Sequence, residues 1–539
     1  GSAWLGRGLV KIRLGRAREG RADLQVAATL EPQRALPRSY LGKAFSHTRD
    51  TARARKELAQ AKKLDPNDPT SWLYSALLAE QQNRINEAVD DLERSKELNE
   101  NRSLFRSRLL LDQDQAVRRA NLAAIYRDAG MTEISAQEAS RAVNDDYGNY
   151  SAHLFLANSY DALRDPKLIN LRYETPWFSE LLLANLLAPA GGGSLSQNIS
   201  QQEYSRFFAG DHLGLFSSTE YRSRGDWLQR GSQYGVLGNT SYSFDAFYRT
   251  QNGERPNNDL EQLELSARFK QQITPQESIL FEASYFDSES GDVAQYYYQR
   301  GKVPGVPSPS LGLRVRETQE PNVLFGYHRE WSPGSRTLFL ASRFEDTLKL
   351  KDPTAELLYF QTAVSPVSGL TNRSLRTAPF VSHLDYQSEL AAYSAELQQI
   401  WQTAAHTLVA GGRYQAAWPE ASSDLGRQTP FDPVPVTIVS QDVNTRLDRA
   451  SVYGYENWQL CDQLRLIVGV SYDRLHYPQN IDTAPITDRE ATKDQVSPKA
   501  GLEWSPGKET HLRSYYAQSL GGVFFDNSVR LEPTQIAGF

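Results

Sequence analysis

The sequence predicts an α+β multidomain protein in two unlike parts, an α-helical repeat array followed by an antiparallel β-barrel that crosses a membrane. In the first 165 residues, equivalent positions recur every 34 residues. From about residue 212, apolar and polar residues alternate with a period of two, which is typical of strands whose two faces meet different surroundings. Short and long connections between these segments also alternate, from residue 271 onward.

The composition excludes several classes of protein. The net charge of the 539 residues is −6, so no overall basic field favours nucleic acid. The mean hydropathy is −0.56, and no apolar run reaches the roughly 20 residues that a membrane-spanning helix needs. Cys461 is the only cysteine, which excludes an internal disulfide and multi-cysteine metal motifs. The chain has one methionine, Met131, and does not begin with it, so we expect a processed or excised chain.

The repeat is visible in small residues, leucines and prolines. Gly8, Gly42 and Ala76 share one position of the period, and Pro32 and Pro66 close two successive repeats. A slip of 13 residues interrupts the register near residues 101–113, after which it returns. The other positions in register are Trp4 and Trp72; Leu24, Leu58 and Leu92; Ala27, Ala61 and Ser95; Leu30, Leu64 and Leu98; Leu122 and Leu156; Ala123 and Ala157; and Tyr126 and Tyr160.

This register resembles the tetratricopeptide repeat, in which small residues let paired helices approach and a proline ends the second helix. We expect about four and a half repeats over residues 1–165. Such arrays bind peptides or proteins on a concave face, so the resemblance implies a protein partner. Each candidate is equally compatible with an ordinary packing or solvated position. The resemblance places these residues on the concave face: Lys43, Leu73, Leu77, Glu80, Arg127, Asn158 and Asp161.

Residues 166–211 are predicted to connect the two parts. A short apolar helix is expected at about 177–187, followed by a flexible linker at Ala190–Ser194. The helix is too short to span a membrane. We expect it to cap the repeat array, and the alternative is a position at a membrane surface or barrel rim.

The strand pattern is clearest in QLRLIVGVSYDR, residues 463–474. Its apolar face carries Leu464, Leu466, Val468, Val470 and Tyr472. Most segments have nine to fourteen residues, close to the 9–11 of a tilted membrane strand and longer than the five or six of a typical soluble strand. The apolar faces are therefore expected to contact lipid. Thirteen segments are predicted, at 212–222, 228–236, 240–250, 259–270, 278–287, 322–331, 337–346, 388–401, 407–417, 448–459, 464–475, 495–504 and 510–518.

The connections indicate an outer-membrane barrel of a Gram-negative bacterium. Tight periplasmic turns and long external loops are the rule in such barrels. Tryptophans near strand ends fit interfacial girdles, although strands are rich in aromatic residues in any case. The short connections are 271–276, 332–336, the stretch near Ala404, 461–463 and 505–509; the long ones are 288–321, 347–387, 418–447 and 476–494; the tryptophans are Trp331, Trp401, Trp418, Trp458 and Trp504.

The direction of the strands gives an expected orientation. If the repeat array is periplasmic, the first strand runs outward and every short turn falls in the periplasm. The thirteenth strand then also runs outward, whereas single-chain bacterial barrels normally have an even number of strands. We therefore expect a truncated barrel (212–539), with further strands beyond residue 539.

Residues 450–474 and 496–520 resemble barrel strand pairs of TonB-dependent outer-membrane receptors. The resemblance implies import of bulky nutrients through a barrel closed by a plug domain. We find no plug domain between the linker and the first strand, and no TonB-contact segment. The domain order instead resembles exopolysaccharide exporters, in which periplasmic tetratricopeptide repeats precede a barrel.

The order of domains favours export of a polysaccharide or another polymer, with the repeats recruiting a periplasmic or inner-membrane partner. The alternatives are nutrient uptake and a non-transporting barrel that displays its loops for adhesion. The candidate lumen residues are polar ones between the apolar positions, each equally compatible with an ion pair that only stabilises the barrel. They are Glu264, Arg268, Lys270, Arg343, Arg413, Arg465 and Asp473.

No catalytic or cofactor motif is present in the sequence. The eight histidines form no HExxH or HxxxH pattern, and there is no GxSxG or GxxxxGK[ST]. We therefore predict a protein that is not an enzyme and holds neither cofactor nor metal.

Overall fold

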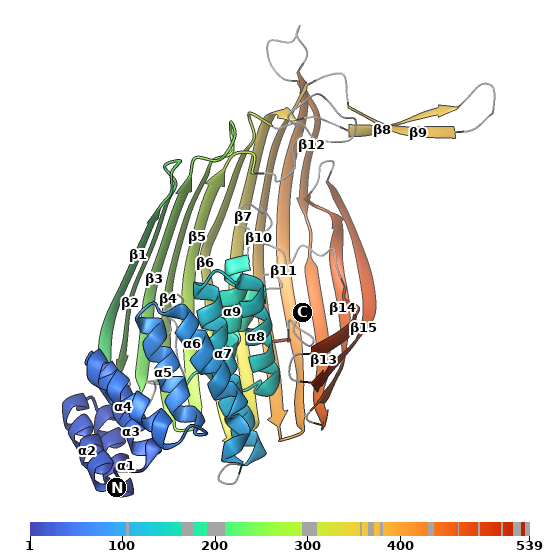
Figure 1. Ribbon diagram of the computed structural model, residues 1–539. Coiled ribbons are helices and arrows are strands. Elements are labelled where there is room, and N and C mark those ends of the chain that lie inside the picture. The colour runs from blue at the N-terminus through green and yellow to red at the C-terminus, as the bar shows by residue number, and fades with distance from the viewer. Residues whose placement is uncertain are drawn as a thin grey trace.

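A computed structural model gives the fold of the protein (Figure 1). Ten α-helices and one 3₁₀ helix precede sixteen strands in the part of the chain that is described. The structure describes residues 1–103, 107–163, 176–190, 211–293, 310–355, 358–364, 371–377, 381–428, 436–461, 463–482, 486–507, 510–520 and 530–533. Much of the expected linker, including Gly191–Ser194, part of the 288–321 loop and the last six residues lie outside these ranges.

The helices form successive antiparallel pairs, as the 34-residue period predicts. Close approach within a pair depends on small residues: a Cβ atom added to Gly8 would lie 2.8 Å from the carbonyl oxygen of Gly20. The slip in register corresponds to the 3₁₀ helix η1 and to α7, which is longer than the other helices. The bounds are α1 Ser2–Arg13, α2 Ala17–Leu30, α3 Ala35–His47, α4 Thr51–Leu64, α5 Pro69–Gln81, α6 Ile85–Glu97, η1 Asn99–Arg102, α7 Arg108–Asp128, α8 Thr132–Asp145, α9 Tyr150–Leu163 and α10 Pro176–Leu187.

The strands form one antiparallel sheet of 14 strands and a separate two-stranded sheet, β8–β9. The thirteen predicted segments correspond to the thirteen strands on the path of the large sheet, which runs in chain order. The count of thirteen was incomplete, because β8, β9 and β12 lie within the expected long connections. The bounds are β1 His212–Tyr221, β2 Trp227–Leu237, β3 Thr240–Gln251, β4 Leu260–Thr274, β5 Glu277–Ser290, β6 Arg314–Ser332, β7 Ser335–Ala355, β8 Leu358–Val364, β9 Thr371–Thr377, β10 Val381–Gln402, β11 His406–Gln428, β12 Val436–Asn444, β13 Leu447–Cys461, β14 Leu464–Asn480, β15 Thr487–Gly507 and β16 Thr510–Ala517.

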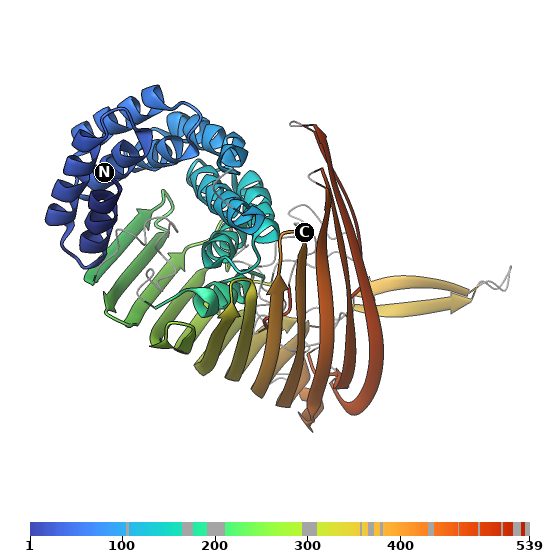
Figure 2. The ribbon, with the colours of Figure 1, turned by 90° about the horizontal axis from the view of Figure 1, so that it is seen from below.

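The sheet curves into an open wall (Figure 2). The two faces of this wall differ in polarity. The convex face carries exposed apolar side chains such as Leu215, 84% exposed, and Val470, 47% exposed. The concave face carries buried polar side chains such as Arg268, 2% exposed. This is the distribution of a membrane barrel, apolar toward lipid and polar toward the lumen. In the described chain, β1 and β16 each pair with one strand only.

The helices lie along the concave side of this wall (Figure 2). Buried side chains of α7, α8, α9 and α10 form a single apolar cluster with side chains of β5, β6, β7, β10, β11 and β13. α10 packs on α9 as well as on β5 and β6. The helix predicted to cap the array therefore also contacts the barrel wall. We refer to α7–α10 as the luminal helices.

The short turns that follow β2, β4, β6 and β10 lie at one edge of the sheet, which is the edge that the repeat array approaches (Figure 1). Two of the turns contain a glycine with positive φ, Gly238 at +57° and Gly334 at +87°, where another residue would be strained. At this edge Arg465 contacts Asp145 of α8. Among the described residues, no helix has the length and apolar character needed to cross a membrane.

Candidate functional site

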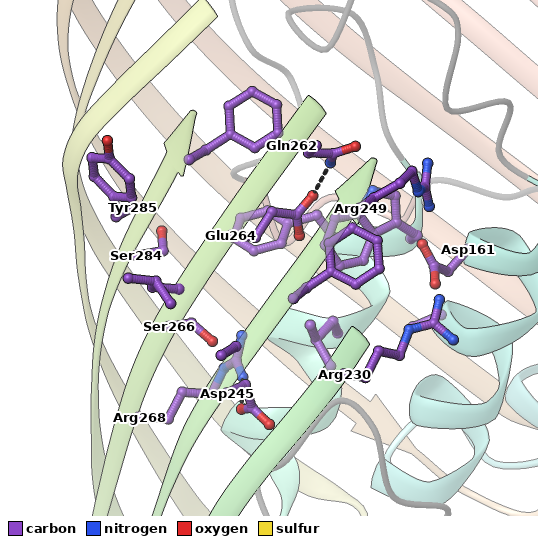
Figure 3. Close-up of a pocket in the computed structure, with 18 of the residues that line it drawn as sticks. Asp161, Arg230, Asp245, Arg249, Gln262, Glu264, Ser266, Arg268, Ser284 and Tyr285 are labelled. Carbon is purple, nitrogen blue, oxygen red and sulfur yellow. Dashed lines mark hydrogen bonds and ion pairs between the residues drawn. The ribbon is translucent and has the colours of Figure 1, made fainter. Parts of the chain in front are cut away.

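A cavity of about 680 Å³ lies between the luminal helices and strands β1–β7 (Figure 3). The helices contribute Arg127, Asn158, Asp161 and Trp177 to its lining. The strands contribute the polar side chains of their concave face. The cavity thus brings together residues of the two parts of the chain, and its size is that of a small-molecule site.

The floor of the cavity is a buried ionic triad on three neighbouring strands. Arg268 of β4 donates to Asp245 of β3 and to Glu282 of β5, each at 2.9 Å. All three side chains are less than 10% exposed. Buried charges are tolerated when they are paired and hydrogen-bonded, so the triad holds a rigid polar surface against the cavity.

A second polar group lies toward the ends of these strands. The guanidinium groups of Arg230 and Arg249 lie 5.4 Å and 4.9 Å from the centre of the Phe247 ring. Figure 3 shows Asp161 on the helical side of the cavity, across from both arginines. Glu264 accepts a hydrogen bond from Gln262 on the same strand. This part of the cavity lining therefore carries both hydrogen-bond donors and hydrogen-bond acceptors.

α10 is fixed to the wall by Lys270. Its side chain is 1% exposed, and the ammonium group donates to the carbonyl oxygen of Leu186 at 2.8 Å and to that of Asn185. These carbonyls belong to the last turn of α10, where a helix has no internal donors and a cation is favoured. Gly326 of β6 gives the helix room, because a Cβ there would lie 2.3 Å from Leu186 Cδ2.

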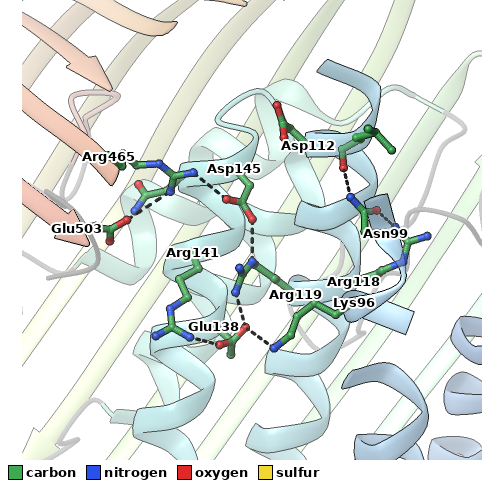
Figure 4. Close-up of polar contacts among 12 residues, drawn as sticks. Lys96, Asn99, Asp112, Arg118, Arg119, Glu138, Arg141, Asp145, Arg465 and Glu503 are labelled. Atoms are coloured by element: carbon green, nitrogen blue, oxygen red, sulfur yellow. Dashed lines mark hydrogen bonds and ion pairs between the residues drawn. The ribbon is translucent and has the colours of Figure 1, made fainter. Parts of the chain in front are cut away.

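A chain of ion pairs fixes α8 to the other half of the sheet (Figure 4). Arg465 of β14 contacts Asp145 at 2.9 Å and Glu503 of β15 at 3.4 Å. Asp145 also contacts Arg119 of α7 at 2.8 Å, and Arg119 contacts Glu138 at 3.1 Å. These side chains are at most 20% exposed, so solvent screens them only partly.

The charge of Glu138 depends on this network. Burial alone would raise its pKa, but Arg119, Lys96 and Arg141 together lower the pKa of Glu138 to about 2. The carboxylate is therefore ionised at any physiological pH, and the network keeps its alternating charges.

A third polar cluster fills the concave side near β10–β15. Tyr453 donates to Glu396 at 2.7 Å, and the backbone N–H of Leu531 donates to the same carboxylate at 2.8 Å. Arg413 lies 3.6 Å from Glu532, in the same short segment as Leu531. Residues 530–533 therefore lie inside the curve of the sheet.

The seven residues predicted for the concave face of the array do not share one environment. Leu73 and Leu77 are buried in the core of the array. Arg127, Asn158 and Asp161 line the cavity.

Lys43 and Glu80 interact electrostatically with each other. Burial lowers the pKa of Lys43 to about 8, partly offset by the charge of Glu80. Burial and the nearby Asp128 raise the pKa of Glu80 to about 7.

Six of the seven predicted lumen residues have side chains on the concave face. Glu264 and Arg268 line the cavity. Lys270 and Arg465 hold the luminal helices, as described above. Arg413 is paired with Glu532, and Asp473 accepts from Arg449 at 2.9 Å.

Arg343 is the exception, and the prediction that its side chain faces the lumen is wrong. It lies opposite Tyr393, which is 50% exposed, and it pairs with Glu345 on the same strand. Its side chain is therefore on the convex face. The strand is apolar on both faces, with Leu338 and Leu340 covered by the luminal helices, so alternation alone gave no reliable assignment.

The sequence reasoning missed several residues of the cavity. Asp245 and Glu282 face Arg268 across adjacent strands, which only the strand register reveals: Asp245 pairs with Ser266, and Arg268 pairs with Glu282. Trp177 was assigned only to a short helix. In the described residues, no group of three or more His, Cys, Asp or Glu side chains is arranged to hold a metal ion.

Comparison with known families adds a match over the strands. Residues 283–534 match the model described as TonB dependent receptor-like, beta-barrel. The barrel is similar to those of TonB-dependent receptors. Barrels of that family lie in the outer membrane of Gram-negative bacteria, and here the strands follow an array of paired helices.

Solved structures with similar folds include receptors and a repeat protein. BauA, the ferric preacinetobactin receptor of Acinetobacter baumannii, is 11% identical over 57% of this chain and 47% of its own, with a TM-score of 0.40. PiuA, a siderophore receptor of the same species, is 12% identical over 57% and 49%, also with a TM-score of 0.40. PilF of Pseudomonas aeruginosa is 15% identical over 35% and 80%, with a TM-score of 0.28.

The chain spans less than half the length of either receptor. No curated protein matches the sequence.

Proposed function

We propose that this protein carries a polysaccharide outward across the outer membrane, with the repeat array in the periplasm. The array would recruit a periplasmic or inner-membrane partner, and the luminal helices would close the passage until that partner binds. The proposed organisation is a repeat domain at 1–165, a connecting segment at 166–211 and a barrel at 212–539.

One observation carries the proposal: the luminal helices share an apolar core with the concave face of the barrel and leave a ligand-sized cavity beside it. A helix packed at that place obstructs the path along the lumen. Buried side chains of α10 pack against buried side chains of α9. A movement of α9 caused by binding of a partner to the array would therefore also move α10.

The proposed orientation has its own support. The array contacts the edge of the sheet that holds the tight turns, and outer-membrane barrels have their short turns in the periplasm. The repeats would then face the compartment in which newly made polymer and its synthetic machinery are found.

Deletion of the gene in the source bacterium tests the proposal. We expect secreted polysaccharide to fall and polymer to accumulate in the periplasm, and a plasmid copy of the wild-type gene to restore secretion. Unchanged secretion in the deletion strain would rule the function out. Secretion by plasmid copies that carry Arg465→Gln or Arg474→Gln is then compared. The two form a matched pair, because Arg465 contacts α8 and the exposed Arg474 does not.

Energised uptake is the second candidate, and the similarity to TonB-dependent receptors favours it. It predicts that the deletion strain loses growth on a scarce nutrient and that a strain lacking TonB shows the same defect. A display barrel predicts neither defect and no passage of solute.

A further inference from the structure

The cavity between the luminal helices and β1–β7 has a lining that restricts its ligand. We infer that it is a binding site for a neutral saccharide unit. The inference rests on the proposed passage of a polysaccharide and deepens it, since it assigns both a site and a charge class to the polymer.

The charge of the lining is nearly balanced. Five arginines face six carboxylates, a net charge of −1, when Arg343 is left out because its side chain is on the convex face. A polyanion would find no excess of positive charge here, and a cationic metal complex would find an excess of only one negative charge. The charged residues are Arg127, Arg222, Arg230, Arg249 and Arg268, with Asp128, Asp161, Glu220, Asp245, Glu264 and Glu282.

Seven of these eleven charges are already paired with one another, including Arg127 and Asp128 at 2.9 Å. Arg268 contacts Asp245 and Glu282. Arg222 contacts Glu220 at 2.7 Å. The pairs leave a surface of fixed dipoles, which suits an uncharged polar ligand better than an ion.

The cavity also contains buried polar atoms that make no hydrogen bond within the described chain. Glu282 Oε2 and Gln251 Oε1 are acceptors that receive no donor, and Arg268 Nε is a donor that meets no acceptor. Buried polar atoms in folded proteins are nearly always satisfied. A hydroxyl group both donates and accepts, so a ligand with several hydroxyls would satisfy atoms of both kinds.

Aromatic rings complete the lining on both sides. Trp177 and Phe178 come from α10, and Phe216 and Phe286 come from β1 and β5. The apolar C–H face of a pyranose ring packs on such rings, while its hydroxyls reach the polar side chains around them. A bound saccharide unit would therefore contact α10 and the barrel wall together.

Calorimetric titration of the full-length protein, purified from outer membranes in detergent, tests the inference. The probes are maltohexaose, cellohexaose and hexa-N-acetylchitohexaose, which represent neutral sugars, and hexagalacturonate, which has the same length and is acidic. We expect at least one neutral probe to bind and the acidic probe to bind about tenfold more weakly or not at all. Binding of the acidic probe as tight as that of the best neutral probe would overturn the inference, as would failure of every neutral probe.

A matched pair of variants locates the site. Gln251→Leu removes an acceptor of the cavity, and Gln229→Leu makes the same change on the neighbouring strand, where the side chain contacts Ser217 on the convex face. Loss of one hydrogen-bond partner should weaken neutral-sugar binding about tenfold in Gln251→Leu and less than about twofold in Gln229→Leu. Equal effects would place the binding elsewhere and refute the site.

Failure of the site and failure of the proposed function give different results. Sugar binding with normal secretion in the deletion strain would leave the site standing and remove the function. Loss of secretion in the deletion strain, with no sugar binding to the purified protein, would leave the function standing and remove the site.

Discussion

Replacing Lys270 by methionine should release α10 from the barrel wall. The ammonium group supplies hydrogen bonds to the carbonyls of Leu186 and Asn185, which end the helix. The methionine side chain is unbranched and only one atom shorter than that of lysine, and it cannot donate a hydrogen bond. The two carbonyls would then be buried without donors for as long as the helix stays docked.

The size of the effect follows from the geometry. A buried carbonyl left without its partner costs about 1–3 kcal/mol, and the helix dipole adds up to about 1 kcal/mol when the cation is lost. Burial of the Lys270 charge itself costs free energy, and the loss of that cost in the variant offsets part of the destabilisation. A net loss of about 2 kcal/mol in docking free energy raises the population of released helix about thirtyfold.

Thiol labelling measures that population. Ala188, at the end of α10, is 8% exposed, and Ala188→Cys in a Cys461→Ser background places one buried thiol there. Maleimide labelling of the Lys270→Met protein should be about thirtyfold faster than that of the parent. Lys349→Met, on an exposed lysine of β7, is the control and should change nothing. Equal rates in Lys270→Met and its parent would refute the role assigned to Lys270.

Two further predictions concern the ion pairs and a buried carboxyl of the array. A double-mutant cycle of Arg465→Gln and Asp145→Asn, read by the same labelling, should give a coupling of about 1–2 kcal/mol, against less than about 0.5 kcal/mol for the exposed pair Arg474 and Asp494. Because burial raises the pKa of Glu80 to about 7, the folded array binds this proton more tightly than the unfolded chain, and its stability falls as pH rises from about 4.5 to 7. Glu80→Gln should remove that fall and stabilise the helices at about pH 8 by up to roughly 3 kcal/mol, measured as helical circular dichroism during denaturation; equal pH dependence in both proteins would contradict the assignment.

Much of the fold could be predicted from local pattern, for a physical reason. Strands with one face toward lipid and the other toward the lumen tend to alternate, so the thirteen strands on the path of the sheet were located. The ends of several strands were assigned to the long connections, as in β11, which continues to Gln428 where the predicted segment ended at 417. β12 and the β8–β9 hairpin lie within the expected connections, and no alternation marks them.

The site was less predictable because it depends on contacts between distant segments. Arg268 was selected as a polar residue between apolar ones, but its partners Asp245 and Glu282 emerge only from the pairing of three strands. The position of α10 on the concave face depends on Lys270, 84 residues beyond Leu186, and nothing in the helix itself indicates it.

Closure of the lumen by the luminal helices is the central claim, and a reversible cross-link tests it most directly. An ideal Cβ at Gly326 lies 3.5 Å from Leu186 Cγ, the atom whose place the sulfur of a cysteine at position 186 would take. Leu186→Cys with Gly326→Cys, in the Cys461→Ser background, would bind α10 to the wall when oxidised. Conductance across planar bilayers should show opening events in the reduced protein and none in the oxidised one. Openings of equal frequency and size in both states would contradict the account, because passage would then not require α10 to move.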